Sequence, residues 1–230
     1  MKVIDISGKI QNGMWNYPAP FPKFDLKPLE KVPWVDGEVY CEIFEGLHSQ
    51  TGTYLETPAH FFGNDSSYLI SDIPVEKLIN IPCVVFGIDG MNNPVEATPI
   101  TKEMLISSSK NIDISKGCAL LISTGWGKHW MEKCFLQQSP YFTYEAMLWL
   151  ISKKPFLLGT DFPRWENIKK SEGFFEAFYR ADILMLAPCI NLEKVEKSNV
   201  KLTVLPLNIT GTSCVPCRAV LIEDGECCDK

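Results

Sequence analysis

The sequence predicts a single α/β domain built on a mixed central sheet, and three observations support this prediction. Strand-like apolar runs recur along all 230 residues, strands alternate with helix candidates in the second half, and the first half is rich in strands alone. Alternating strands and helices favour parallel pairing, whereas the first half adds antiparallel pairing. Residues 1–230 show no internal repeat and no domain boundary, and their number suits one domain with a substantial core.

The expected strands are short runs dominated by apolar residues. Several are almost continuously apolar, as expected of strands that are covered on both faces. Residues 38–44 (EVYCEIF) alternate instead, which is typical of a half-exposed strand. The runs are residues 2–7, 38–44, 82–89, 118–124, 155–161, 182–190, 202–209 and 218–224.

Helices are expected between the later strands. The candidates are residues 101–109, 143–154 and 171–181. Thr101 and Thr143 stand where a side-chain oxygen would cap the first turn, and lysines end the second candidate. Ser171 precedes the mixed apolar run of the third candidate.

Composition and charge restrict the class of partner. The chain is 46% hydrophobic and 22% charged, an ordinary globular balance, and its formal charge of −6 argues against nucleic acid. Asp5 and Ser7 break the apolar run at the amino terminus, so we do not expect a secretory signal. No run approaches the roughly 20 apolar residues of a membrane span. We therefore expect a cytoplasmic protein whose partner is a small molecule, with neither nucleic acid nor membrane as a partner.

The nine cysteines are scattered and odd in number, as is common for buried apolar positions in a cytosolic protein. The clusters Cys214-Val-Pro-Cys217 and Cys227-Cys228 raise the alternative of a metal or redox site. Two adjacent cysteines substitute poorly for the second pair of a zinc site, and the first cluster lies among strand-like segments. We expect structural roles for both clusters.

Residues 11–37 form an N-terminal arm that is rich in proline and aromatic residues. Leaving aromatic side chains such as Trp15 and Trp34 in water would be costly. We expect the arm to wrap across a surface, cover a pocket or reach a second subunit.

One stretch, GLHSQTGTYLETPAHFF at residues 46–62, has the features of a site. Pro58 prevents a regular helix between Glu56 and His60, so a turn would bring these two side chains into one cleft. A histidine beside a carboxylate is a usable acid–base pair. The alternative is that His60 caps a turn and Glu56 is solvated.

The three histidines limit any metal site. A hydrolytic zinc ion normally takes three protein ligands, and His48, Glu56 and His60 are the set that this stretch offers. His48 would share a strand face with Gln50 by the period of two. His129 follows two glycines in GWGKHW, and we expect it to lie on the surface.

Motifs over nearly the whole chain resemble the cyclase family that contains bacterial kynurenine formamidases and isatin hydrolases. The stretch TGTYLETPAHF resembles the family signature H-x-G-T-H-x-D-x-P-x-H-F. The other matching stretches are VIDISGKIQNGMWNYP, LLISTGWGKHW, LLGTDFP, INLEKV and LPLNITGTSCVPCRAVLI. The resemblance implies a swivelling β/β/α fold, assembly as a homodimer or homotetramer, and zinc or manganese that activates water. It also implies that the last signature histidine, His60 here, is the general acid–base.

The ligand positions of the signature are mostly substituted in this chain. The two earlier histidines of the signature fall on Gln50 and Tyr54, and its aspartate falls on Glu56. Later family ligands fall near Phe175 and on Ala187. Phenylalanine and alanine cannot coordinate, and glutamine and tyrosine are weak ligands for zinc. We therefore expect a divergent family member without a cofactor, with zinc or manganese as the alternative.

Cys189 lies close to the vacated ligand position at Ala187, in the register that Asn191 and Leu192 fix. A cysteine there could act as a nucleophile, but an apolar strand setting would raise its pKa and blunt its reactivity.

Three functions follow from these residues. In the first, Glu56 and His60 transfer protons without a metal on a small cyclic or aromatic amide, a lactone or an enolisable ketone. Substrate contacts are then expected from Gln50, Tyr54, Trp15 and Phe175. In the second, the protein is an inactive ligand-binding or structural homologue, in which Tyr54 and Phe175 fill the vacated cavity beside Ala187. The third is conventional metal-dependent arylformamidase chemistry.

Overall fold

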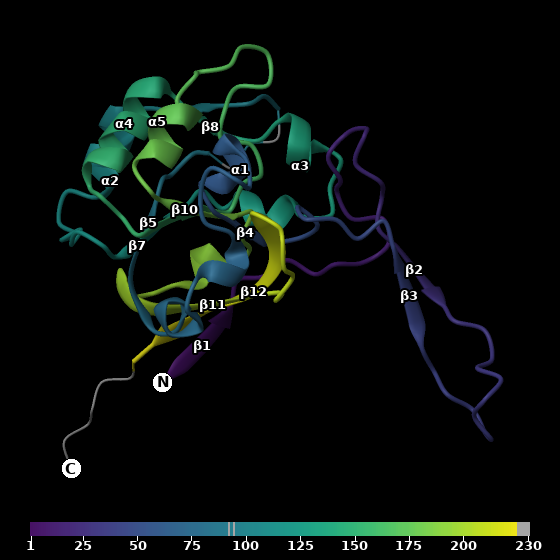
Figure 1. Ribbon diagram of the computed structural model, residues 1–230. Helices are drawn as coiled ribbons and strands as arrows, with labels where there is room; N and C mark the ends of the chain where they lie inside the picture. Colours follow the sequence, from purple (N-terminus) through teal and green to yellow (C-terminus); the bar gives the residue numbers. More distant parts are fainter. Residues whose placement is uncertain (92, 94, 225–230) are drawn as a thin grey trace.

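The computed structural model describes residues 1–91, 93 and 95–224, and shows a mixed β-barrel with helices on its outer face (Figure 1). The strands are β1 (Lys2–Asp5), β2 (Asp25–Pro28), β3 (Glu42–Glu45), β4 (Tyr54–Glu56), β5 (Ile81–Gly87), β6 (Pro99–Ile100), β7 (Ala119–Ser123), β8 (Tyr141–Phe142), β9 (Leu157–Thr160), β10 (Leu184–Ala187), β11 (Asn199–Pro206) and β12 (Cys214–Glu223). The α-helices are α1 (Ala59–Phe62), α2 (Lys102–Ser108), α3 (Cys134–Gln137), α4 (Tyr144–Ser152) and α5 (Phe175–Arg180). Short 3₁₀ helices are η1 (Ile70–Asp72), η2 (Val75–Leu78), η3 (Trp126–His129) and η4 (Leu192–Lys194). The predicted mixed α/β class is confirmed.

The main sheet closes on itself. Its strands follow the order β1-β12-β11-β5-β7-β9-β10-β4, and β4 also pairs with β12. The pairs β5–β7, β7–β9 and β9–β10 are parallel, and the remaining pairs of the barrel are antiparallel. The closing strand β4 was not among the strands expected from sequence, because three residues of mixed polarity give no periodic signal. A strand at residues 38–44 was expected, and its end does form β3, but β3 pairs with β2 in a separate hairpin.

Alternation along each strand separates two cores. Leu121 of β7 points into the barrel, where it joins Leu55, Leu202 and other mostly aliphatic side chains. Leu120, its neighbour on β7, points outward into an aromatic-rich core beneath α2, α4 and α5. Strand β4 pairs with β10 on one side and with β12 on the other, so both of its edges are hydrogen-bonded and the barrel is closed there.

Two of the three expected helix starts are confirmed. Thr101 accepts a hydrogen bond from the Met104 amide, and Thr143 accepts one from the Ala146 amide. The third helix starts later than Ser171, at Phe175. The Ser171 hydroxyl donates to Glu166 instead, so it is committed to the preceding loop.

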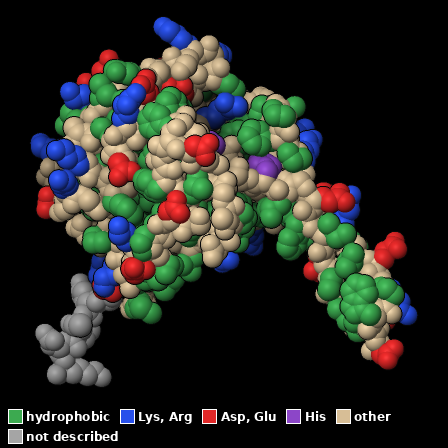
Figure 2. All heavy atoms as spheres, in the orientation of Figure 1, with side chains coloured by type: hydrophobic (Ala, Val, Ile, Leu, Met, Phe, Trp, Pro, Cys, Tyr) green, Lys and Arg blue, Asp and Glu red, His purple; other side chains and the backbone are tan. Residues whose placement is uncertain are grey.

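The N-terminal arm divides into two parts with different surroundings. Trp15 is buried in the outer core, whereas Trp34 is 83% exposed. Strands β2 and β3 form a hairpin that projects from the body of the molecule (Figures 1 and 2). Among the described residues, no helix is long and apolar enough to cross a membrane.

Candidate functional site

Strand β4 places its polar side chain on the outer face of the barrel. Leu55 points into the interior, so Glu56 points outward by strand alternation. Glu56 lies opposite Cys214 on β12 and opposite Met185 on β10. The carboxylate is therefore the centre of a row that crosses three strands, and this row forms the floor of the site.

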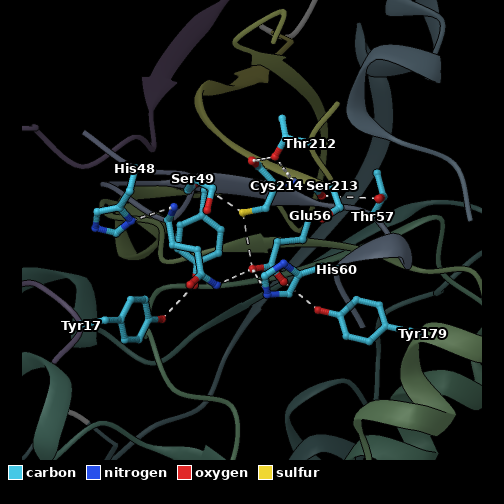
Figure 3. Close-up of polar contacts among 12 residues, drawn as sticks. Tyr17, His48, Ser49, Glu56, Thr57, His60, Tyr179, Thr212, Ser213 and Cys214 are labelled. Atoms are coloured by element: carbon cyan, nitrogen blue, oxygen red, sulfur yellow. Dashed lines mark hydrogen bonds and ion pairs between the residues drawn. The ribbon is translucent and has the colours of Figure 1, made fainter. Parts of the chain in front are cut away.

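The Glu56 carboxylate is buried and held by hydrogen bonds from three directions (Figure 3). The residue is 2% exposed. The Gln50 side-chain amide donates to Oε1 at 2.7 Å, and the Tyr179 hydroxyl donates to Oε2 at 2.7 Å. The Cys214 sulfur lies 3.6 Å from Oε1. The alternative in which Glu56 is solvated is therefore wrong, because Gln50, Tyr179 and Cys214 surround the carboxylate.

His60 lies beside this carboxylate and reaches solvent. Pro58 occupies the N-cap position of α1, so Glu56 stands before the helix and His60 inside it, and the turn that the sequence predicts is present. His60 Nε2 lies 3.5 Å from Glu56 Oε1, and the His60 side chain is 37% exposed. A buried carboxylate at this distance orients the accessible imidazole ring.

Two tyrosines meet next to the acid–base pair. The hydroxyls of Tyr17 and Tyr54 are 2.8 Å apart, and the Tyr17 hydroxyl donates to the Pro163 carbonyl at 2.9 Å. Because Tyr17 has one hydroxyl proton, Tyr54 is the donor in the tyrosine pair. Burial raises the pKa of both phenols, so both stay neutral. The tyrosine that binds Glu56 is Tyr179 rather than Tyr54.

These residues line a cavity of about 540 Å³. Gln50, Tyr54, Glu56, His60 and Phe175 all line it. Its rim is the loop of residues 163–171.

Trp15 occupies a different position from the one expected. It lies behind Tyr17, with ring centroids 5.3 Å apart, and packs edge-on against Trp130 in the outer core. Tyr17 is therefore the arm residue that lines the cavity, and Trp15 packs behind it in the outer core.

The structure does not bring His48 to Glu56 and His60. His48 Nε2 lies 3.2 Å from Asn16 Oδ1, and its ring packs against Phe21 with centroids 4.8 Å apart. His48 Nδ1 accepts from the Gln50 amide, and burial lowers the His48 pKa. Residues 46–53 form turns rather than a strand, with Gly52 at φ 77°, so the expected shared face of His48 and Gln50 does not form.

The expectation that His129 lies on the surface is wrong. His129 is 6% exposed and packs against Trp126, with ring centroids 4.7 Å apart. Its Nδ1 lies 2.8 Å from the Glu132 carboxylate. The loop folds back as η3, and this brings the imidazole under the indole.

Cys189, Cys214 and Cys217 lie in or against the two cores. Cys214 and Cys217 are both free and belong to the two opposite cores of the barrel wall. Burial raises the pKa of Cys214, and the Glu56 charge adds to that effect. Cys189 is fully buried, and burial raises its pKa, so its thiol is a poor nucleophile. The Cys227-Cys228 cluster lies outside the described residues.

The residues at the site match a family-type metal centre poorly. Gln50 uses its amide protons on Glu56, Tyr54 uses its proton on Tyr17, and Ala187 lies opposite Tyr54 with no ligand atom to offer. A different grouping does converge, since ligand atoms of Glu56, His60 and Cys214 lie within 4.8 Å of one another. The same lone pairs of Glu56 accept protein hydrogen bonds, and the raised pKa keeps the Cys214 sulfur protonated.

The sequence analysis missed Tyr17, Tyr179, Cys214 and Met185 as parts of the site. Tyr179 comes from α5 and is 123 positions from Glu56, and Cys214 is 158 positions away. Tyr179 falls four positions after Phe175, which a helical period would have placed on the same face. Only this signal was available in the sequence, because strand pairing decides the other contacts.

The fold and the site define a mixed α/β-barrel protein with a histidine–carboxylate pair in a cavity on the outer face of the barrel. The chain belongs to the cyclase family: a family model described as "Putative cyclase" matches residues 4–167. No curated protein matches the chain.

Solved structures show the same fold. An isatin hydrolase bound to the product analogue thioisatinate aligns with a TM-score of 0.81 and 19% identity, covering 97% of this chain and 93% of that one. Isatin hydrolase A from Ralstonia solanacearum aligns with a TM-score of 0.80 and 20% identity, covering 97% of this chain and 92% of that one. A predicted metal-dependent hydrolase from Bacillus stearothermophilus aligns with a TM-score of 0.74 and 21% identity, covering 97% of this chain and 98% of that one.

Proposed function

We propose that the chain is an enzyme of the cyclase family that uses Glu56 and His60 for acid–base chemistry without a metal. Its substrate is a small cyclic or aromatic amide, a lactone or an enolisable ketone. One observation carries the proposal: a buried carboxylate, fixed by protein donors, lies 3.5 Å from an imidazole that reaches the cavity.

Each residue of the pair has a separate task. His60 is accessible, so it takes a proton from the substrate or returns one. Glu56 stabilises the imidazolium that forms, and Gln50 and Tyr179 keep the carboxylate in place. The neutral Tyr54 and Tyr17 pair forms a polar wall beside the reacting group. Enolisation and dehydration need no more than this proton transfer. Opening a cyclic amide or lactone also needs a water molecule: His60 takes a proton from the water as it attacks the carbonyl carbon, and returns the proton to the ring nitrogen or oxygen as that bond breaks.

Paired substitutions test the proposal. His60→Ala and Glu56→Gln should each lower turnover about 10²- to 10⁴-fold on a panel of cyclic amides, lactones and enolisable ketones. His48→Gln is the control, because it removes a histidine that does not line the cavity. Unchanged turnover in both site variants would contradict the proposal and leave a ligand-binding protein, which a ligand that raises the melting temperature without being converted would support.

Metal-dependent hydrolysis is a second candidate, because Glu56, His60 and Cys214 converge within 4.8 Å. Relatives described as metal-dependent hydrolases share the fold. The test is metal analysis of protein purified without chelator. Stoichiometric zinc or manganese, together with arylformamide hydrolysis that a chelator abolishes and Cys214→Ala lowers, would replace the first proposal with this one.

We also propose that the chain forms homodimers or homotetramers through the β2–β3 hairpin. The hairpin exposes Trp34 (83%), Tyr40 (84%) and Phe44 (59%), although it projects from the body and covers little of it. Aromatic side chains on a projecting hairpin are typical of a surface that another subunit covers. A second copy of this chain would supply that cover.

We place the protein in the cytoplasm. All seven cysteines that the structure describes are free thiols. A reducing compartment keeps thiols in that state. A disulfide in the protein isolated under alkylating conditions would contradict this placement.

A further inference from the structure

The rim of the cavity is strongly cationic in a chain whose formal charge is −6. Arg164, Lys169 and Lys170 all line the cavity from the loop of residues 163–171. Among the residues that the structure describes, none of these three cations forms an ion pair, whereas Arg180 and Arg218 each bind a carboxylate. The loop therefore offers positive charge that no described carboxylate neutralises.

The one acidic residue of this loop is already engaged. Glu166 accepts hydrogen bonds from the Ser171 hydroxyl at 2.6 Å and from the Gly173 amide at 2.7 Å. The Phe174 amide adds a third bond at 3.3 Å. Glu166 therefore stabilises the end of the loop and does not neutralise Arg164.

Arg164 is the deepest of the three cations. It is partly buried, its guanidinium carbon lies 5.9 Å from the centre of the Tyr17 ring, and its Nε is buried without a hydrogen-bond partner. Leaving a buried donor of a charged group unpaired is costly, and a carboxylate is the group that the planar guanidinium fork binds best.

Aromatic rings also line the cavity. Phe61 and Tyr179 are nearly parallel, with centroids 5.8 Å apart and planes at 22°. The Phe175 ring is also nearly parallel to the Tyr179 ring, with centroids 6.1 Å apart and planes at 19°. Phe61 is 48% exposed and lines the cavity, so it offers an open ring face to a flat ligand.

From these observations we infer that the substrate carries a carboxylate on a flat ring, and that Arg164 binds this carboxylate. The inference deepens the proposed function, on which it rests for the reacting end of the molecule. Arg164 receives the carboxylate, Phe61 and Phe175 contact the ring, and the reactive group faces His60. Lys169 and Lys170 are exposed, so they attract the anion over a longer range and contribute less to the bound state.

A pair of matched probes tests the inference: 2-aminobenzoate and 2-aminobenzamide differ in the charge of a single substituent. Calorimetric titration of the wild-type protein should give about tenfold tighter binding of the carboxylate. Arg164→Gln should remove that preference and leave the affinity for the amide within about twofold. Arg164→Lys should give an intermediate preference for the carboxylate, because lysine keeps the positive charge but lacks the planar guanidinium that donates two parallel hydrogen bonds.

Lys116→Gln is the control, because it removes one exposed cation that does not line the cavity. It should leave both affinities unchanged, and melting curves should show that each variant is folded. Equal binding of the two probes, absence of binding by both, or an equal loss for both in Arg164→Gln would overturn the inference. Failure of the proposed function has a different readout, since it appears as unchanged turnover in His60→Ala and Glu56→Gln.

Discussion

The two faces of the barrel wall carry different kinds of side chain, although the same strands supply both. The interior is mostly aliphatic and contains residues such as Leu55, Leu121 and Leu202. The outer face carries aromatic rings, and at β4 it carries the buried polar row of Glu56 and its partners. The aliphatic interior therefore contributes mainly to the stability of the closed barrel, whereas the outer face holds the candidate site.

An interior truncation should have the largest effect on stability. Leu202→Ala removes a fully buried side chain from a closed barrel that cannot collapse around the cavity, so it should cost about 2–5 kcal/mol of unfolding free energy. Denaturant titration measures the loss, and turnover per folded molecule should not change. Ile106→Ala, at a position 44% exposed on α2, is the control. A matching loss of turnover in Leu202→Ala would break the separation between the two faces.

Asp161, which directly follows β9, should give a pH-dependent effect on stability of somewhat smaller size. Burial raises the pKa of Asp161 from 3.8 to about 6, although Thr124 and Gly125 donate hydrogen bonds to it. The folded protein therefore holds this proton more tightly than the unfolded chain, so ionisation of Asp161 lowers stability as the pH rises from about 4 to about 6. The loss is complete above pH 6 and amounts to about 3 kcal/mol.

The measurement compares wild type with Asp161→Asn, which cannot ionise. The difference between their unfolding free energies should change across pH 4–6 and become constant at higher pH. A constant difference across the whole range would show that the hydrogen bonds compensate for burial.

Removing a hydroxyl from the site should have a smaller effect. Tyr54→Phe leaves the Tyr17 hydroxyl without its donor, which should cost about 1 kcal/mol in denaturant titrations. Tyr144→Phe, at a position 39% exposed, is the matched control. Equal losses in the two variants would show that the tyrosine pair contributes nothing to stability. A large loss of turnover in Tyr54→Phe alone would extend the catalytic machinery beyond Glu56 and His60.

The hairpin should show the smallest effect on the unfolding of a single chain. Trp34→Ser changes a side chain that is 83% exposed, so the unfolding free energy extrapolated to low protein concentration should change by less than about 0.5 kcal/mol. The same change should shift the assembly toward monomers in sedimentation velocity. An unchanged association state would separate the hairpin from assembly.

Local patterns predicted much of the fold. Thr101 and Thr143 cap their helices because a short polar side chain just before a helix reaches the backbone amides of its first turn. This contact is local, so it does not depend on the rest of the fold. Apart from β4, the buried strands of the barrel were evident from their apolar runs. The start of α5 was misplaced, because the Ser171 hydroxyl found Glu166 in the folded loop. A side chain with two available partners cannot be assigned from sequence alone.

The candidate site was predicted in part for the same reason. Glu56 and His60 are neighbours in sequence around Pro58, so a turn was enough to bring them together. His48 is also close in sequence, but its ring turns toward Asn16 and Phe21. Turn geometry over a few residues decides that direction, and the sequence carried no signal for it.

By itself, the sequence determined the α/β class, the family resemblance and the closeness of Glu56 and His60 around Pro58. Tertiary structure alone decided that β4 closes the barrel, and that Tyr179 and Cys214 reach Glu56 across 123 and 158 positions. The physical reason is that side-chain periodicity is a local property, whereas the partners of a buried carboxylate depend on which distant strands and helices pack beside it.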